Sequence, residues 1–450
     1  MTSRNAPFKK AKSDPARLLA LKVIGDVNQR GAYSNLRLPK ALAESSLDER
    51  DRAFATEIVY GTLRMQGLYD LILTLISTRP WKDVDPDIQD IVRMGAHQIF
   101  SMRVAEHAAV SATVDLARIT VGEPAGSFTN ALMRKLLAHS LDEWLEQMPP
   151  TRDPVVLLAR RYSHPEWIVS AYWDLLKSEE LVEKELISNN TPATPTLVAW
   201  PGDSSVEDLL EFGGERTEYS SYGVRGGTSP YANPLVTSRR AGVQDEGSQL
   251  VASIFFRANQ GAHSMLDLCA GPGGKAALLS HLAFEAGVEF TANEISEPRA
   301  ALVEQVVKNT PVRVGDGRTI CDDGHMYDAI LADVPCTGIG ALRRRPEVRW
   351  RRTLKDLSSL LALQYELADA AISVLNPGGV LGYATCSPHY AETSGQVARI
   401  LKEHPEMELI PVNPYLPEGL EGAVRNGSLS LWGHEHNTDA MFLALLRKKA

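Results

Sequence analysis

The sequence contains little cysteine and no long apolar run, and each shortage excludes a class of protein. Its 450 residues include four cysteines, none of them in a CxxC pair. This pattern argues against a disulfide framework and against a structural zinc site, so we expect no bound metal. No stretch approaches the roughly 18 uninterrupted apolar residues of a membrane span, and the first residues lack the apolar centre of a signal peptide. We therefore expect a cytoplasmic protein with no membrane partner.

Charge is acidic overall but unevenly distributed. The net charge of -9 and the pI of about 5.7 weaken the case for a general nucleic-acid binder, because whole-protein charge governs non-specific association with polyanions. Basic residues nevertheless cluster at residues 4–12 and between Arg343 and Lys355. An acidic body with a basic band is compatible with a selective RNA enzyme, and equally with a solvated helix face.

The length and the local patterns predict a multidomain protein. Residues 1–145 carry apolar side chains at helical spacing and little alternation of period two, which predicts an all-helical domain. Residues 146–235 contain a helix, a short candidate strand and a Gly/Ser-rich stretch, which predict a small mixed α+β subdomain or linker. Residues 236–450 alternate short apolar runs with helical ones, and this alternation predicts an α/β domain with a largely parallel, doubly wound sheet.

A glycine-rich turn follows the first expected strand of the third region. It reads DLCAGPGGK at residues 267–275, where glycines allow close backbone approach to a ligand. The spacing is neither GxGxxG nor the Walker pattern, which weakens the case for a dinucleotide or ATP. Glu294 closes the second strand, where it can bind a ribose diol, and Asp316 follows the third, near an adenine amino group. Either acid alone could be a helix cap, but the ordered set predicts an S-adenosyl-L-methionine site.

Two cysteines follow consecutive expected strands. Cys336 comes after the strand that ends at Asp333, and Cys386 comes after the next strand, at 380–385. Either cysteine alone is more simply an inert buried thiol. Because one right-handed crossover joins the two strands, we expect them to be adjacent, with both thiols at the carboxyl edge of the sheet. Thiols at that edge, one of them close in sequence to the basic stretch from Arg343 to Lys355, suggest thiol chemistry on an anionic substrate.

Five motifs of the third region resemble one enzyme family in their order. They read DLCAGPGGK, ANE, GDGR, DVPCTGIGALRRRPEVRW and ATCS. Together they resemble the Sun (Fmu) family of RNA cytosine-5 methyltransferases, which implies a Rossmann-like class I methyltransferase domain at residues 236–450 with S-adenosyl-L-methionine as cofactor. Residues 49–64, 93–117 and 126–136 resemble the NusB-like RNA-binding domain, which implies that residues 1–145 bind RNA.

The resemblance also implies a role for individual residues. Cys386 is the implied nucleophile, Cys336 the thiol that assists proton removal and release, and Asp333 the group that holds the ring nitrogen and amino group of cytosine. Cys321 matches no catalytic role. Arg343 and its neighbours are expected to face RNA. The implied cofactor-binding residues are Cys269, Ala270, Gly271, Pro272, Gly273, Gly274, Lys275, Glu294, Arg299, Asp316 and Asp333.

Two stretches depart from the family's pattern. Val198-Ala199-Trp200 stands where the family often carries Arg-Val-Asn, which puts RNA contacts from the small subdomain in doubt. His434-Glu435-His436 has the composition of a metal site, but we interpret it as a loop near the substrate and assign no metal.

The expected function is methylation of carbon 5 of a cytosine in small-subunit (16S) ribosomal RNA by a monomeric enzyme. Two alternatives remain open in RNA: a tRNA or large-subunit rRNA cytosine as the target, and a non-catalytic RNA-binding assembly factor. A DNA cytosine methyltransferase would be expected to rely on the Pro-Cys cysteine alone. The Thr385-Cys386 pair therefore favours RNA.

Overall fold

The computed structural model describes residues 12–102 and 104–450 and divides into two compact units. The first, the helical unit, comprises residues 1–170 together with Arg344–Arg351. The second, the sheet unit, comprises Ala171–Arg343 and Arg352–Ala450. Among the described residues, no helix combines the length and the apolar character needed to cross a membrane.

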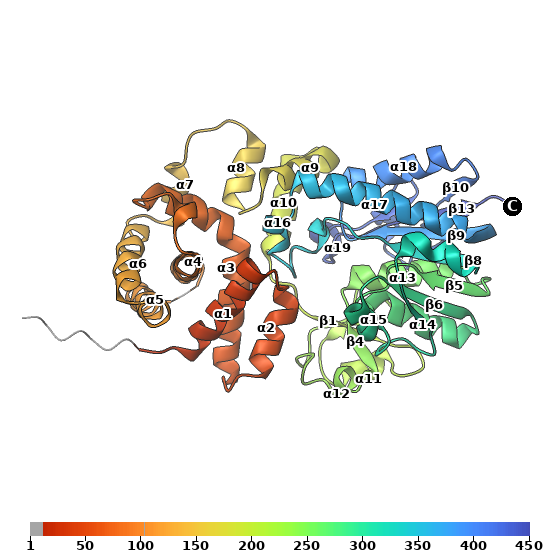
Figure 1. Ribbon diagram of the computed structural model, residues 1–450, viewed down its shortest axis with the longest axis horizontal. Helices are drawn as coiled ribbons and strands as arrows, with labels where there is room; N and C mark the ends of the chain where they lie inside the picture. Colours follow the sequence, from red (N-terminus) through yellow and green to blue (C-terminus); the bar gives the residue numbers. More distant parts are fainter. Residues whose placement is uncertain (1–11, 103) are drawn as a thin grey trace, which may run out of the picture. The chain divides into compact units, whose positions relative to one another are not determined.

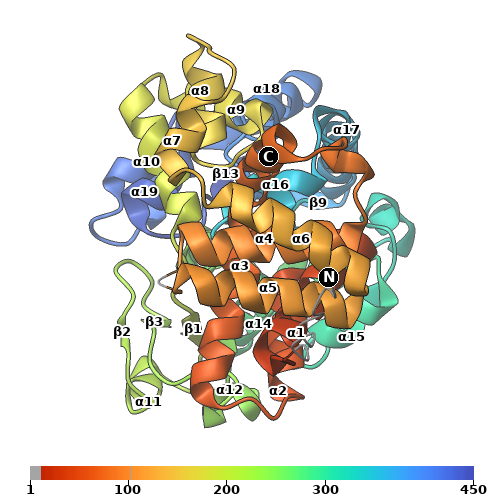
Figure 2. The same ribbon diagram turned by 90° about the vertical axis from the view of Figure 1, so that its left-hand side faces the viewer.

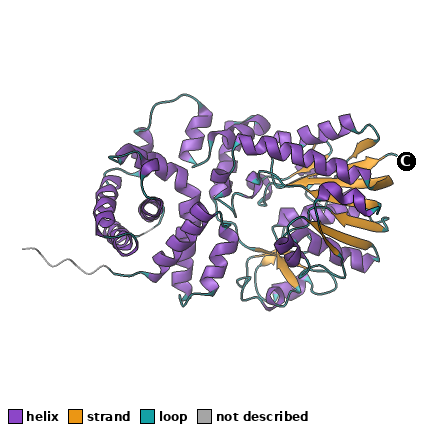
Figure 3. Ribbon diagram, viewed as in Figure 1, coloured by secondary structure: helices purple, strands orange, loops and turns teal. Residues whose placement is uncertain are grey.

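The helical unit contains helices and no strand in its described residues (Figure 3). Its first helix is capped by Asp14, whose side chain accepts a hydrogen bond from the backbone N–H of Arg17, and it ends at Gly31, which has φ 74°. Helices α3 to α6 pack beside one another around the apolar core (Figure 2). The helices are α1 (Pro15–Arg30), α2 (Ser34–Ala43), α3 (Glu49–Ile76), α4 (Pro86–Phe100), α5 (Glu106–Thr120), α6 (Glu123–Leu136), α7 (Leu141–Glu146) and α8 (Pro154–Arg161).

A segment from the far end of the chain completes the helical unit. Arg344–Arg351, which includes α16 (Val348–Arg351), returns to this unit from the sheet unit. Arg349 is fully buried and donates to the carbonyl oxygens of Arg64 and Ser163 at 3.3 and 3.1 Å. The carboxylate of Glu347 accepts from the backbone and hydroxyl of Ser34 at 3.1 and 2.6 Å. The expectation that the arginines of this stretch face RNA is therefore wrong for Arg349, because its guanidinium is buried and bonded to backbone carbonyls.

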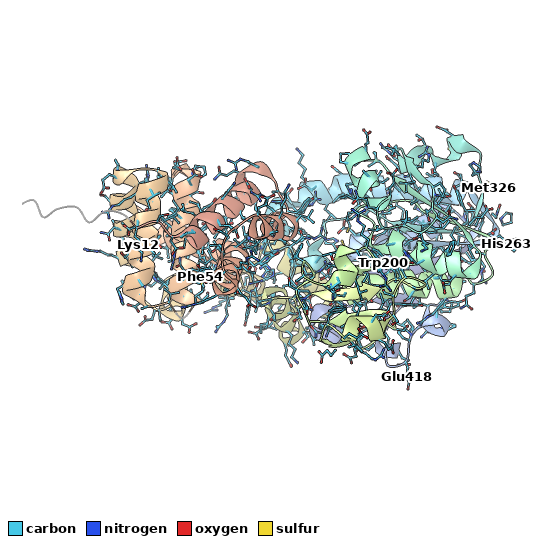
Figure 4. The ribbon with its side chains drawn as sticks, turned by 90° about the horizontal axis from the view of Figure 1, so that it is seen from below. Lys12, Phe54, Trp200, His263, Met326 and Glu418 are labelled. Carbon is cyan, nitrogen blue, oxygen red and sulfur yellow. The ribbon has the colours of Figure 1, made fainter. Side chains whose placement is uncertain are left out.

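The sheet unit begins with a small antiparallel subdomain. Its four strands lie in the order β2-β3-β1-β4. Trp200, directly after β1 and labelled in Figure 4, is buried and stacks on His281 with ring centroids 5.3 Å apart. Trp200 thus serves as a core side chain rather than a stacking platform for bases. The elements are α9 (Glu166–Leu176), which starts in the helical unit, α10 (Glu179–Asn190), β1 (Thr196–Ala199), α11 (Val206–Leu210), β2 (Glu215–Arg216), β3 (Gly223–Arg225), α12 (Pro234–Thr237) and β4 (Ala241–Val243).

The large sheet has the strand order β11-β12-β13-β9-β8-β5-β6-β7, with β10 paired to β13. The strands β7, β6, β5, β8 and β9 are parallel to one another, and β13 is antiparallel to β9. The expected adjacency of β8 and β9 is confirmed, with Asp333 opposite Ala384. The strands are β5 (Ser264–Asp267), β6 (Glu289–Glu294), β7 (Val312–Val314), β8 (Tyr327–Asp333), β9 (Leu375–Thr385), β10 (Met407–Ile410), β11 (Val424–Arg425), β12 (Ser428–Ser430) and β13 (Phe442–Lys448).

Helices cover both faces of this sheet (Figure 1). Successive strand residues point to opposite faces, so Ala329 and Leu331 of β8 join one apolar core while Ile330 and Ala332 join another. The doubly wound α/β expectation is therefore confirmed. One core also contains side chains of α13 (Glu246–Ala258), α14 (Gly274–Ala286) and α15 (Glu297–Val303), and the other those of α17 (Leu354–Ser373) and α18 (Ser394–Glu403).

Candidate active site

The carboxyl ends of the five parallel strands meet along one edge of the large sheet, where ligands of such folds bind. His263 and Met326, which directly precede β5 and β8, mark the opposite edge in Figure 4. All residues that the sequence predicts to carry chemistry lie in segments that leave the carboxyl edge. These are residues 268–275 after β5, Glu294 at the end of β6 and Arg299 after it, Asp316 after β7, Asp333 at the end of β8 and Cys336 after it, and Cys386 after β9.

The glycine-rich turn and the acid of the next strand form one hydrogen-bonded unit. A β carbon on Gly271 would lie 2.2 Å from Oε2 of Glu294, so the Glu294 carboxylate would have to move, and Gly273 has φ 114°. The backbone N–H of Gly271 donates to Glu294 at 3.0 Å. Arg299 donates to the Gly271 carbonyl and lies 3.4 Å from the Glu294 carboxylate. The hydrogen bonds from Gly271 to Glu294 and from Arg299 to Gly271 thus hold the turn in place, and a side chain on Gly271 would interfere with them.

Three carboxylates concentrate negative charge beside this turn. Burial, and then the charge of Asp333, raises the pKa of Asp267 to about 7. Its Oδ2 atom is buried with no hydrogen-bond partner in the described part of the chain. Burial, followed by the charges of Asp267, Asp333 and Glu294, raises the pKa of the Cys269 thiol well above its ordinary value. Cys269 therefore stays protonated, and the surrounding acids suit a ligand that carries positive charge.

Asp316 combines both interpretations that the sequence offers. It lies at the carboxyl edge and also caps the short helix η2 (Gly317–Asp323), accepting the backbone N–H of Arg318 at 3.0 Å. Hydrogen bonds from the Arg318 side chain, and then from its backbone, lower the pKa of Asp316. The acid is therefore ionised and fixed in place, with part of its surface open to solvent.

Lys275 and Asp333 form an ion pair at the centre of the edge. Nζ of Lys275 lies 2.8 Å from Oδ2 of Asp333, and both side chains are largely shielded from solvent. Burial lowers the pKa of Lys275, but the charges of Asp333 and then Cys386 oppose this effect and raise it overall. Lys275 therefore remains an ammonium group paired with the acid of β8.

The two predicted cysteines meet at this edge. Their Sγ atoms lie 3.4 Å apart, although the residues stand in loops of different strands. The hydrogen bond to Cys386, then burial, raises the pKa of Cys336 well above its ordinary value. Cys336 is therefore protonated. The backbone N–H of Gly340 also donates to the Cys386 carbonyl at 3.0 Å, which joins the two loops.

Other predicted residues lie away from this chemistry. Cys321 is exposed in η2. Arg343 is buried and donates to the side chain of Asn437 at 2.9 Å and to the Thr438 carbonyl. His434 lies in α19 (Gly433–His436) and pairs with buried Glu185 at 2.6 Å. Among the described residues, no group of three or more His, Cys, Asp or Glu side chains could hold a metal ion.

Sequence reasoning overlooked Asp267 and Gly340. Asp267 stands at the end of a buried strand immediately before the glycine turn, and a carboxylate in such a place was a usable signal. The need for glycine at 340 comes from the carbonyl oxygens of Ala440 and Cys386, 2.1 and 2.8 Å from where a β carbon would lie. No local pattern announces that long-range contact.

Comparison with known families assigns both ends of the chain. Residues 255–447 match the family described as 16S rRNA methyltransferase RsmB/F, and residues 14–138 match the NusB family. These matches agree with the α/β and helical architectures described above.

Individual relatives cover most or all of the chain. A Mycobacterium tuberculosis protein, Rv1407, is 41% identical over the full length of both chains. That protein is described as a methyltransferase by inference, and its description names no substrate. Ribosomal RNA small subunit methyltransferase B of Pseudomonas putida is 30% identical over 86% of this chain and 89% of its own. The crystal structure of PH0851 shares the fold, with a TM-score of 0.80 and 23% identity over 98% of this chain and 100% of its own. The chain therefore belongs to the RsmB/F family of S-adenosyl-L-methionine-dependent RNA cytosine methyltransferases, with a NusB-family domain at its N-terminus.

Proposed function

We propose that this protein methylates carbon 5 of a cytosine in small-subunit (16S) ribosomal RNA, with Cys386 as nucleophile and Cys336 as the release thiol. The 3.4 Å separation of their sulfur atoms is the observation that carries the proposal. The family description and the Pseudomonas putida relative both name small-subunit ribosomal RNA, and they support this target over tRNA or large-subunit RNA.

The carboxyl edge of the sheet carries acidic side chains that suit the positive charges of the cofactor. S-adenosyl-L-methionine supplies an activated methyl group on a sulfonium, and it also carries an ammonium group. The buried, unpartnered oxygen of Asp267 and the neighbouring carboxylates offset those positive charges. We assign its binding to residues 269–275 with Glu294, Arg299, Asp316 and Asp333.

Lys275 favours the thiolate form of Cys386. Its ammonium, shielded from solvent, interacts with Cys386 as well as with Asp333, and a buried cation favours a neighbouring anion. The Cys386 thiolate adds to carbon 6 of the cytosine, and the electron pair displaced from the ring double bond makes carbon 5 nucleophilic. Asp333 is assigned to the ring nitrogen and amino group of the base. Carbon 5 would then take the methyl group from the bound cofactor, whose sulfur would keep the electron pair of the broken sulfur–methyl bond.

Release requires that carbon 5 loses its proton and that the bond between carbon 6 and sulfur breaks. The electron pair of the carbon 5–hydrogen bond restores the ring double bond, and Cys386 leaves with the pair of the broken carbon–sulfur bond. Because Cys336 is protonated beside Cys386, it can give its proton to the leaving sulfur and accept the proton of carbon 5. Both cysteines end as thiols, and Cys386 loses one proton to solvent before the next cycle.

The helical unit is assigned to RNA binding. Its match to the NusB family supports this role, and its basic residues outnumber its acidic residues, whereas the sheet unit has an acidic excess. A basic excess confined to one of the two units restricts phosphate contacts to that unit, which explains how an acidic protein can bind RNA.

The target can be tested by bisulfite mapping of RNA from a deletion strain and from the complemented strain. The proposal expects one 16S cytosine to lose its methyl group on deletion and regain it on complementation with the wild type but not with Cys386→Ala. Loss of methylation in tRNA or large-subunit RNA alone would contradict the 16S target while leaving the cytosine chemistry intact.

A further inference from the structure

Glu392 is a fully buried carboxylate directly behind the two cysteine loops. It ends the short helix η4 (Tyr390–Glu392), six residues after Cys386, and none of the roles assigned above uses it. Removing a carboxylate from water is costly unless hydrogen bonds replace its solvation. The identity of its donors therefore shows what the carboxylate holds in place.

In the part of the chain that the structure describes, each group that donates a hydrogen bond to the Glu392 carboxylate lies in the Cys336 loop or also binds that loop. The backbone N–H of Thr337 donates to Oε1 at 2.8 Å, and the Thr337 hydroxyl donates to Oε2. The amide of Gln364, on α17, donates to Oε1 at 2.9 Å and to the Pro335 carbonyl at 3.0 Å. The residues on both sides of Cys336 are thus fixed to the carboxylate, one directly and one through Gln364.

The same network reaches the Cys386 loop. The hydroxyls of Thr337 and Ser387 lie 3.1 Å apart. The hydroxyl of Tyr383, on β9, donates to the Glu392 carbonyl at 2.9 Å. Glu392, Thr337 and Ser387 are all buried, so water cannot replace these bonds. One carboxylate therefore joins the loop of one cysteine to the loop of the other.

We propose that Glu392 is a positioning residue that holds the Pro335–Thr337 turn so that the Cys336 thiol stays within reach of the Cys386 adduct. The inference rests on the proposed function, because it requires Cys336 to act in release. Glu392 acts through the turn and touches no reacting atom. Small misplacements of a proton-transfer group are costly, with about 1 Å able to slow a step roughly 100-fold.

The proposal separates two steps that general damage would impair together. Addition by Cys386 and methylation do not need the Cys336 turn in its exact place, whereas release does. In Glu392→Gln the side chain keeps its shape and its amide oxygen can still accept from the N–H groups of Thr337 and Gln364, but the acceptor has lost its negative charge, which weakens both bonds. We therefore expect a variant that forms the adduct at nearly the normal rate and releases it slowly.

The experiment compares full-length wild type, Glu392→Gln, Glu392→Ala, Cys336→Ala and the exposed control Glu403→Gln on α18. Each protein is incubated with 16S rRNA and labelled cofactor, and the covalent protein–RNA species is quantified on denaturing gels together with single-turnover methyl transfer. Melting curves check the fold. For Glu392→Gln we expect adduct accumulation about tenfold above wild type, multiple-turnover kcat lower by about 10- to 100-fold, and KM for the cofactor within about twofold.

Each result has a definite meaning. If Cys336→Ala accumulates adduct and folded Glu392→Gln does not, the positioning role is wrong and the proposed chemistry stands. If Cys336→Ala itself turns over without adduct, the release role of Cys336 fails first. Equal losses of single-turnover transfer and release in Glu392→Gln would also overturn the proposal, since they would indicate general disruption of the site.

Discussion

Nζ of Lys275 lies 2.8 Å from Oδ2 of Asp333, so the glycine-rich turn pairs its cation with the acid that ends β8. The proposed mechanism uses this cation to favour a thiolate at Cys386. The hydrogen bond to Cys386, and then burial, raises the pKa of Cys336, so the two cysteines have different roles in that mechanism. The following predictions start from that asymmetry.

The two cysteines should fail in different ways when each is replaced. Cys386→Ala removes the sulfur that bonds to carbon 6, so we expect no methyl transfer and no covalent species. Cys336→Ala keeps the nucleophile but removes the release thiol, so we expect an adduct that survives denaturing electrophoresis. The exposed Cys321 gives a matched control, and Cys321→Ala should behave as wild type. Full activity of Cys386→Ala would refute the mechanism.

Gly340 should be intolerant of any side chain. A β carbon there would lie 2.1 Å from the Ala440 carbonyl oxygen and 2.8 Å from that of Cys386, and both neighbours are backbone atoms. We expect Gly340→Ala to lower the free energy of unfolding by about 1–3 kcal/mol and to reduce methyl transfer strongly, because the Cys386 loop must move. In Gly261→Ala the new carbon meets nothing within 4 Å, so both urea denaturation and activity should match wild type. Equal behaviour of the two variants would contradict this account.

Arg349 should act as a structural residue and not as an RNA contact. It is fully buried and donates to two backbone carbonyls of the helical unit. Arg349→Ala should therefore lower the free energy of unfolding by about 1–3 kcal/mol for each carbonyl left without its donor. For folded protein at low temperature, the dependence of RNA affinity on salt should keep its slope. A slope reduced by about one unit would instead identify a phosphate contact. Lys355→Ala, at an exposed position, provides the comparison.

The sequence predicted the parts of the molecule that local patterns and strand order determine. Asp14 and Gly31 bound the first helix because capping depends on neighbouring residues. The meeting of Cys336 and Cys386 followed from two consecutive parallel strands joined by one crossover. Burial of Arg349 could not be predicted in this way, because its partners lie 285 and 186 residues away in the chain.

The acidic residues of the site also divide into those that strand order predicts and those whose role depends on long-range packing. Glu294 could be identified because it ends one strand, and Asp316 because it closely follows the next. The hydrogen-bond donors to Glu392 could not be identified in this way. In the sequence a carboxylate after a cysteine motif looks like any solvated acid, and only the structure shows that Thr337 and Gln364 donate to it. Pairing within a sheet is therefore predictable from pattern, whereas the partners of a buried polar group depend on the finished packing.

Asp267 should make the stability of the cofactor-free protein depend on pH near neutrality. Burial, and then the charge of Asp333, raises its pKa from 3.8 to about 7, so the folded state favours the neutral acid more than the unfolded state does. Its stabilising contribution is complete below about pH 4 and is lost as pH rises through 7. We expect the free energy of unfolding to fall between pH 5 and 8 by an amount on the order of a few kcal/mol.

Asp267→Asn replaces the neutral acid with a group that cannot ionise, so this fall should flatten and the variant should exceed wild type in stability at pH 8. Urea denaturation of cofactor-free protein at pH 5, 6, 7 and 8 measures the effect, with exposed Asp174→Asn as the control. Wild type should bind the cationic cofactor more tightly than Asp267→Asn does, because the variant lacks the carboxylate that offsets the charge of the cofactor. Parallel pH curves for wild type and Asp267→Asn would show that the acid is already ionised in the folded protein.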